Sequence, residues 1–118
     1  NGPLSRSHAD SASGRVEYER FVRYGLTTDL VITPTGSAQG ANRVEFDADY
    51  LEAFRVERIT PEPASVRIKG SRIVYEFAST APDAAISFHI RPQQLWRHTS
   101  VVSIDGGAPV EVSQLTYP

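Results

Sequence analysis

Short stretches of alternating apolar and polar residues, each ended by glycine, proline, asparagine or aspartate, fill most of the chain after Arg15. Successive side chains of a β-strand point to opposite faces, so a period of two is the pattern of strands with one face on a core. The sequence therefore predicts an all-β protein. The rows expected to face one core are Val44 and Phe46, Val66 and Ile68, Ile73, Tyr75 and Phe77, Ile86, Phe88 and Ile90, Val102 and Ile104, and Val110 and Val112.

Turn-forming residues mark where these strands are joined. Gly70 and Ser71 separate two alternating rows and predict a short hairpin, and residues 105–107, Asp-Gly-Gly, predict another near the end of the chain. A strand is expected to stop at residues 60–63, TPEP, because proline has no N–H to donate to a ladder. Residues 49–54, DYLEAF, are the segment expected to form a helical turn, as a crossover between sheets.

Two segments depart from simple alternation. In residues 15–24 the phase shifts at Phe21 and Val22, which predicts a β-bulge. In residues 28–33 the three apolar residues from Leu30 to Ile32 follow one another, which predicts a strand buried on both faces.

Strands at this spacing, with no long amphipathic helix, favour one fold class. We expect a two-sheet sandwich of the immunoglobulin-like, Greek-key kind with about seven to nine strands. A small β-barrel is the alternative. The 118 residues suit a single domain. Residues 1–14 are rich in serine, glycine and alanine and are expected to be a flexible linker or stalk, which leaves 15–118 as the sandwich domain.

Composition and motifs set several kinds of chemistry aside. The formal charge of −2 gives no overall field that would attract a nucleic acid. The chain has no cysteine, which rules out disulfides and thiol chemistry, and its three histidines, His8, His89 and His98, share no metal-ligand spacing. No nucleophile elbow, P-loop or dinucleotide-binding glycine motif occurs. We therefore expect neither enzymatic activity nor a cofactor.

Two groups of residues remain as candidate sites. Asp47, Asp49 and Glu52 gather hard oxygen ligands after a strand, as calcium sites in sandwich domains do, but their spacing is not that of an EF-hand, and a solvated acidic turn is the alternative. Trp96, followed by Arg97 and His98, is a candidate binding surface for a sugar or a protein. The alternative, which we prefer, is that the tryptophan caps one end of the core.

Three longer stretches carry a resemblance. RVEYERFVRYG, DYLEAFRVERITPEP and the closing QLTYP resemble a group of small uncharacterised bacterial proteins, over about Val16 to Pro118. In that group an N-terminal membrane helix carries an exported sandwich domain. The resemblance thus implies a domain on the periplasmic or outer side of a bacterial membrane, and the absence of methionine fits an anchor upstream of the chain. These motifs are structural, so they transfer no catalytic or binding residue.

We therefore expect a non-enzymatic interaction module of the cell envelope. It would contact an unknown envelope protein through a sheet face or an exposed edge strand, and would meet the membrane only through the missing N-terminal anchor. The alternative is a small-ligand or carbohydrate-binding domain that uses Trp96, Arg97, His98 and the loop around Asp49.

Overall fold

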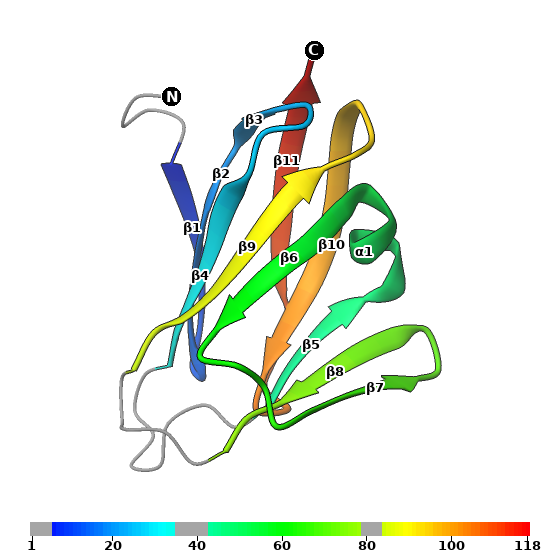
Figure 1. The fold of residues 1–118 in the computed structure, drawn as a ribbon. Coiled ribbons are helices and arrows are strands. Elements are labelled where there is room, and N and C mark those ends of the chain that lie inside the picture. The colour runs from blue at the N-terminus through cyan, green and yellow to red at the C-terminus, as the bar shows by residue number, and fades with distance from the viewer. Residues whose placement is uncertain (1–5, 35–42, 79–83) are drawn as a thin grey trace.

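The computed structural model describes residues 6–34, 43–78 and 84–118. These residues form two β-sheets packed face to face, with a radius of gyration of 13.4 Å (Figure 1). Each sheet ends in two edge strands, so neither closes into a barrel. The predicted all-β sandwich is confirmed.

The order of strands is β1-β2-β4-β9-β6 in the first sheet and β3-β11-β10-β5-β8-β7 in the second. The first sheet contains β1 (Arg6–Ser11), β2 (Gly14–Glu19), β4 (Thr28–Pro34), β9 (Ile86–Pro92) and β6 (Phe54–Thr60). The second contains β3 (Phe21–Arg23), β11 (Val110–Tyr117), β10 (Trp96–Ile104), β5 (Arg43–Asp47), β8 (Arg72–Glu76) and β7 (Ser65–Lys69). All neighbours are antiparallel except β3 and β11, which are parallel. Helix α1 (Ala48–Ala53) connects β5 to β6, and so crosses between the sheets as predicted.

Residues 1–14 are not simply a flexible linker, because Arg6–Ser11 form strand β1. This strand is one reason why the described residues contain more strands than the seven to nine expected. It pairs with β2 from Arg6 opposite Glu19 to Ser11 opposite Gly14. Its side chains are mostly polar, and only Ala9 packs against the core. The backbone ladder, rather than apolar burial, defines this strand, so the hydrophobic pattern does not reveal it.

The phase shift after Glu19 is a change of sheet, not the predicted β-bulge. The chain leaves the first sheet at the end of β2 and joins the second as β3, beside β11. In β4, Leu30 and Ile32 are buried while Val31 is half-buried on the outer face. Burial on both faces is therefore only partial.

Most of the predicted core rows are buried, and aromatic rings fill the centre. The ring of Phe46 lies 5.0 Å from that of Phe88 and 5.2 Å from that of Tyr50, measured between centroids. Tyr50 comes from α1, and its hydroxyl donates a hydrogen bond of 3.0 Å to Oε1 of Gln114. Burial raises the pKa of this phenol above its ordinary value. The crossover helix thus closes the core between the two sheets.

One predicted core row is exposed. Val66 and Ile68 of β7 are 54% and 76% exposed, although their cross-strand partners Tyr75 and Ile73 are buried and half-buried. The reason is that β7 is the last strand of its sheet, and all five of its residues are exposed. The alternation that marks a core-facing strand here marks an edge strand with one apolar face.

Candidate functional site

Exposed apolar side chains gather at one end of the sandwich. Within the described residues, every large hydrophobic side chain that stays exposed lies there, apart from Val66 and Ile68. These side chains come from β3, the β3–β4 loop, the β9–β10 loop and the end of β11, at the top of Figure 1. We call this surface the apolar end, and its residues are Phe21, Tyr24, Leu26, Leu95, Trp96 and Tyr117.

Backbone hydrogen bonds join the loops of the apolar end. The N–H of Tyr24 donates to the carbonyl of Tyr117 over 2.9 Å, and the N–H of Gly25 donates to the carbonyl of Pro92 over 3.2 Å. The β9–β10 loop is tied in turn to the end of α1, because the N–H of Gln93 donates to the carbonyl of Ala53. These hydrogen bonds therefore connect the β3–β4 loop with the end of β11 and with the end of β9.

Trp96 does not cap the core, contrary to the preferred prediction. It is 59% exposed, and its φ of +77° lies in the left-handed region that non-glycine residues rarely adopt. A residue held in such a region costs about 1–3 kcal/mol, and such residues cluster at binding sites. An exposed tryptophan in a strained conformation is therefore a candidate contact residue.

Arg97 and His98 do not share a face with each other. Both lie in β10, where successive residues point to opposite sides. Arg97 donates a hydrogen bond of 3.4 Å to the hydroxyl of Ser113, while the His98 ring lies 6.0 Å from the rings of Tyr50 and Phe54. Trp96 and Arg97 are exposed while His98 is turned toward Tyr50 and Phe54, so the three side chains do not form a single patch.

Arginines border the apolar end. The guanidinium of Arg20 lies 5.4 Å from the centre of the Phe21 ring, in a cation–π arrangement. Arg23 and Arg97 are exposed, and neither forms an ion pair with a carboxylate of the described residues. The nearby carboxylate of Glu57 is already paired with Arg91 over 2.7 Å. Arg20, Arg23 and Arg97 thus place positive charge at the border of the apolar end.

Edge strand β7 is a second candidate surface. Its apolar side chains, Val66 and Ile68, point to one face, while Arg67 and Lys69 point to the other. Arg67 is paired with Glu76 of β8 over 2.8 Å, and Lys69 forms no ion pair with a carboxylate of the described chain. An edge strand leaves one row of backbone N–H and C=O groups free for another chain.

The other three edges carry features that discourage such pairing. Strand β1 carries Arg6, His8 and Asp10 on its exposed face, and β3 has only 3 residues. In β6 the register shifts between Val56 and Arg58, and an irregular edge pairs poorly with a flat strand. Strand β7 keeps an unbroken register along its whole length and is therefore the edge best suited to pairing.

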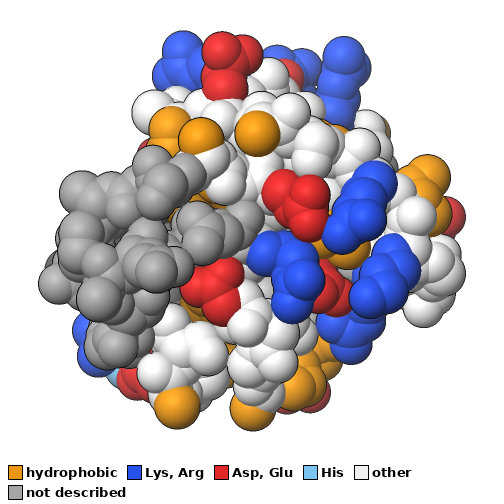
Figure 2. Space-filling model, turned by 90° about the horizontal axis from the view of Figure 1, so that it is seen from below, with side chains coloured by type: hydrophobic (Ala, Val, Ile, Leu, Met, Phe, Trp, Pro, Cys, Tyr) orange, Lys and Arg blue, Asp and Glu red, His pale blue; other side chains and the backbone are white. Residues whose placement is uncertain are grey.

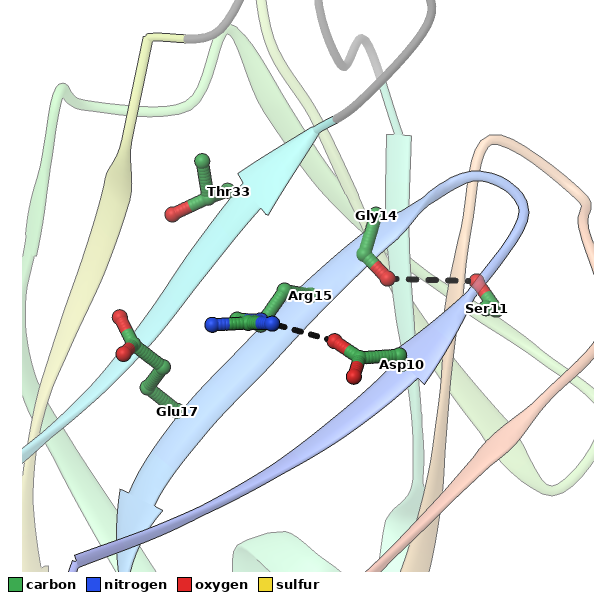
Figure 3. A pocket seen from close by; sticks show the side chains of 6 residues that line it. All are labelled: Asp10, Ser11, Gly14, Arg15, Glu17 and Thr33. Atoms are coloured by element: carbon green, nitrogen blue, oxygen red, sulfur yellow. Dashed lines mark hydrogen bonds and ion pairs between the residues drawn. The ribbon is translucent and has the colours of Figure 1, made fainter.

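A polar hollow lies on the outer face of the first sheet, with a volume of about 490 Å³. Figure 3 shows Arg15 and Asp10 pointing toward each other within it, 2.8 Å apart, with Glu17 and Thr33 beside them. The hydrogen bond from Arg15 lowers the pKa of the Asp10 carboxyl. Asp10 and Arg15 therefore pair with each other across the floor of this hollow.

His89 lies between two hydrogen-bonding partners on the same outer face. Its Nδ1 is 2.7 Å from Oδ1 of Asp29, and its Nε2 is 3.4 Å from the hydroxyl of Thr60. The order of groups is that of a hydrolase triad, but β4 and β9 use their backbone N–H groups in ladders, so they offer no oxyanion-binding donors. The contact is a cross-strand pair of surface side chains.

The calcium candidates do not converge. Asp47 accepts hydrogen bonds from the N–H of Val101 at 3.3 Å and the hydroxyl of Ser100 at 3.5 Å, which ties the start of α1 to β10. Asp49 and Glu52 are exposed on α1. Across the described ranges, no three histidine, aspartate or glutamate side chains come together as a metal ion would require.

Comparisons with known proteins add no assignment. No family model matches the chain, and no curated protein is significantly similar to it. Among the described residues, no helix has both the length and the apolar character needed to cross a membrane. The apolar end and strand β7 are therefore the features of the molecule that bear on its function.

Proposed function

We propose that this domain is a non-enzymatic interaction module of the bacterial envelope, which binds an extended segment of another protein along β7. The observation that carries the proposal is the geometry of this strand: an unbroken edge, exposed over its whole length, with Val66 and Ile68 on one face. Only a polypeptide can pair with the backbone groups of an edge strand, so this surface points to a protein partner. The sequence resemblance described above supports the envelope location.

Strand addition would extend the core. Val66 lies opposite Tyr75 and Ile68 lies opposite Ile73, so the apolar face of β7 continues the inner face of β8. A partner strand with apolar side chains at alternate positions would cover this row, and each Å² of apolar surface removed from water contributes about 25 cal/mol. The backbone ladder would supply affinity and the apolar row would fix the register.

Charge indicates the composition of the partner strand. Arg67 and Lys69 occupy the other face of β7, so acidic residues at alternate positions of the partner would lie beside them. Antiparallel pairing of two copies of β7 centred on Arg67 would instead place this arginine against itself, which is unfavourable. We therefore expect an acidic segment of a different protein rather than a second copy of this chain.

Photocrosslinking tests this surface. A photoreactive phenylalanine analogue would replace Ile68, and a control protein would carry it at the exposed Glu111 of the same sheet. We expect a discrete crosslinked envelope protein from position 68 only. Excess wild-type domain should abolish the crosslink, whereas excess Ile68→Pro should not, because proline removes an N–H that points away from β8 in this register. Equal competition by both proteins would reject pairing at β7.

Localisation is tested separately. The full-length protein should fractionate with membranes, and protease added to spheroplasts should digest this domain while leaving a cytoplasmic marker intact. Protection of the domain together with the marker would contradict the envelope location without bearing on β7.

A further inference from the structure

We propose that the apolar end rests on an anionic lipid bilayer, with the tips of the β3–β4 and β9–β10 loops in the interfacial region. This contact goes beyond the proposed function, because it needs neither a partner at β7 nor a membrane anchor. It is made by the folded domain itself, through side chains from four segments of the chain.

The shape of the apolar end suits a broad surface. Tyr24 and Leu26 lie in the β3–β4 loop, and Leu95 is the last residue of the β9–β10 loop. A backbone hydrogen bond joins the β3–β4 loop to the end of β11, and another joins it to the end of β9. Figure 1 shows both loops and the C-terminal end of β11 on the same side of the sandwich. The exposed side chains therefore lie at one end of the sandwich, and a single approach of this end could place them at an interface.

The side-chain types match an interface between water and lipid. Tryptophan and tyrosine have an apolar body and a polar tip, and they are enriched where a membrane protein passes from hydrocarbon to headgroups. Trp96, Tyr24 and Tyr117 supply these rings, and Leu26 and Leu95 supply purely apolar side chains. Trp96 is 59% exposed, so its ring is accessible to an interface.

The charges select an anionic surface. Arg23 and Arg97 border the apolar end without a carboxylate partner among the described residues, and Arg20 lies over the Phe21 ring. Basic residues next to a membrane-inserted patch are attracted to anionic headgroups. Figure 2 shows the opposite end from below, where basic and acidic side chains are interspersed over the part that the structure describes. Arg23 and Arg97 therefore give the apolar end a positively charged border that suits an anionic surface.

The path of the chain agrees with this orientation. Arg6, the first residue of β1, lies opposite Glu19, directly before the residues that lead into β3. The first described residue therefore lies at the same end of the sandwich as β3. Strand β7 lies away from this end in Figure 1 and would stay open to a partner.

Trp96 makes the proposal directly measurable, because it is the only tryptophan of the chain. Its fluorescence would be followed as vesicles of phosphatidylglycerol mixed with phosphatidylcholine, or of phosphatidylcholine alone, are added. We expect a blue shift and co-sedimentation with the anionic vesicles, quenching by lipids brominated on the acyl chain, and weaker binding at high salt. Unchanged emission with both kinds of vesicle would overturn the proposal, and the apolar end would then remain as a surface for a protein.

Matched variants separate the roles of charge and apolar insertion. Arg23→Glu with Arg97→Glu should weaken binding to anionic vesicles at least about tenfold, since each basic residue near such a surface contributes several-fold. Arg15→Glu with Arg58→Glu changes the net charge equally at exposed positions outside the apolar end and should bind like wild type. If both double variants lost vesicle binding equally, net charge alone would explain the binding, which would contradict a specific contact at the apolar end.

Leu26→Ser should abolish the blue shift while leaving the melting temperature unchanged, because Leu26 is exposed. A Leu26→Ser protein that binds and shifts as wild type does would show that this loop stays outside the bilayer, against the proposal. Since vesicle binding uses none of the residues of β7, failure here would leave the proposed function standing, and the reverse also holds.

Discussion

The fold holds the backbone of Trp96 in a left-handed conformation that tryptophan rarely adopts. Its φ of +77° follows from its position, where the β9–β10 loop enters the strand that pairs with β11 at Thr116. The Gln93 N–H bond to Ala53 holds the loop just before it. Neither tie depends on the indole ring, so the strain belongs to the backbone path and would affect any residue with a Cβ at this position.

Replacing Trp96 by glycine should therefore stabilise the fold relative to replacing it by alanine. Alanine keeps the left-handed strain while glycine removes it, and we expect Trp96→Gly to exceed Trp96→Ala in free energy of unfolding by about 1 kcal/mol. Urea unfolding of the two variants measures the difference. If alanine were equal or better, the backbone of residue 96 would not be left-handed in solution.

Tyr50 should make stability fall at alkaline pH. Burial raises the pKa of its phenol, so between the unfolded value near 10 and the folded value only the unfolded chain ionises there, and the free energy of unfolding falls as the pH rises. Tyr50→Phe should lose about 1–2 kcal/mol at neutral pH, because Gln114 Oε1 loses its donor, yet show a shallower decline above about pH 10. Parallel pH profiles of the two proteins would contradict this assignment.

At the scale of elements, alternation identifies strands but not how much of each strand is covered. Val66 and Ile68 have the same pattern as Ile86 and Ile90, and sequence alone places all four in the core. Coverage depends on which strand faces which across the sandwich, and this is a property of the sheet order. For this reason the turn at Gly70 predicts the hairpin of β7 and β8, but the sequence does not predict that β7 is exposed.

Two isoleucines test this difference directly. Ile90 has no exposed surface, so Ile90→Ala should cost about 2–5 kcal/mol of unfolding free energy. Ile68 is 76% exposed, and Ile68→Ala should cost less than about 1 kcal/mol. Chemical denaturation of both variants measures the contrast, and similar losses would place β7 inside the core after all.

Asp47 connects the start of helix α1 to β10, a structural role that the spacing of Asp47, Asp49 and Glu52 in the sequence does not predict. Its carboxylate accepts from the N–H of Val101, so Asp47→Ala should cost about 1–2 kcal/mol by leaving that donor unpaired. Added calcium should leave the melting temperature of the wild-type domain unchanged, because Asp49 and Glu52 do not converge on this carboxylate. A calcium-dependent rise, lost in Asp47→Ala, would revive the metal site.

For the whole molecule, sequence predicts the fold class, the crossover helix and both hairpins, because each depends on local patterns. It does not predict the apolar end. Trp96, Tyr24 and Tyr117 lie far apart in the chain, and nothing in their local sequences separates them from core aromatics such as Tyr75. They meet only because the ladders of β3, β10 and β11 end at the same side.

The sequence predicts a flexible linker at residues 1–14, whereas the structure has strand β1 there, and the two interpretations predict different stabilities for a truncated protein. A protein lacking residues 1–11 should still fold, because β1 contributes only Ala9 to the packing of the core. It should nevertheless melt lower by roughly 4 °C, corresponding to about 1 kcal/mol for the lost ladder with β2 and the lost pair of Asp10 with Arg15. In the full chain, amides that β1 contributes to the ladder should exchange more slowly with solvent than those of a linker would. An unchanged melting temperature together with unprotected amides would restore the flexible stalk and leave β2 as the edge of the first sheet.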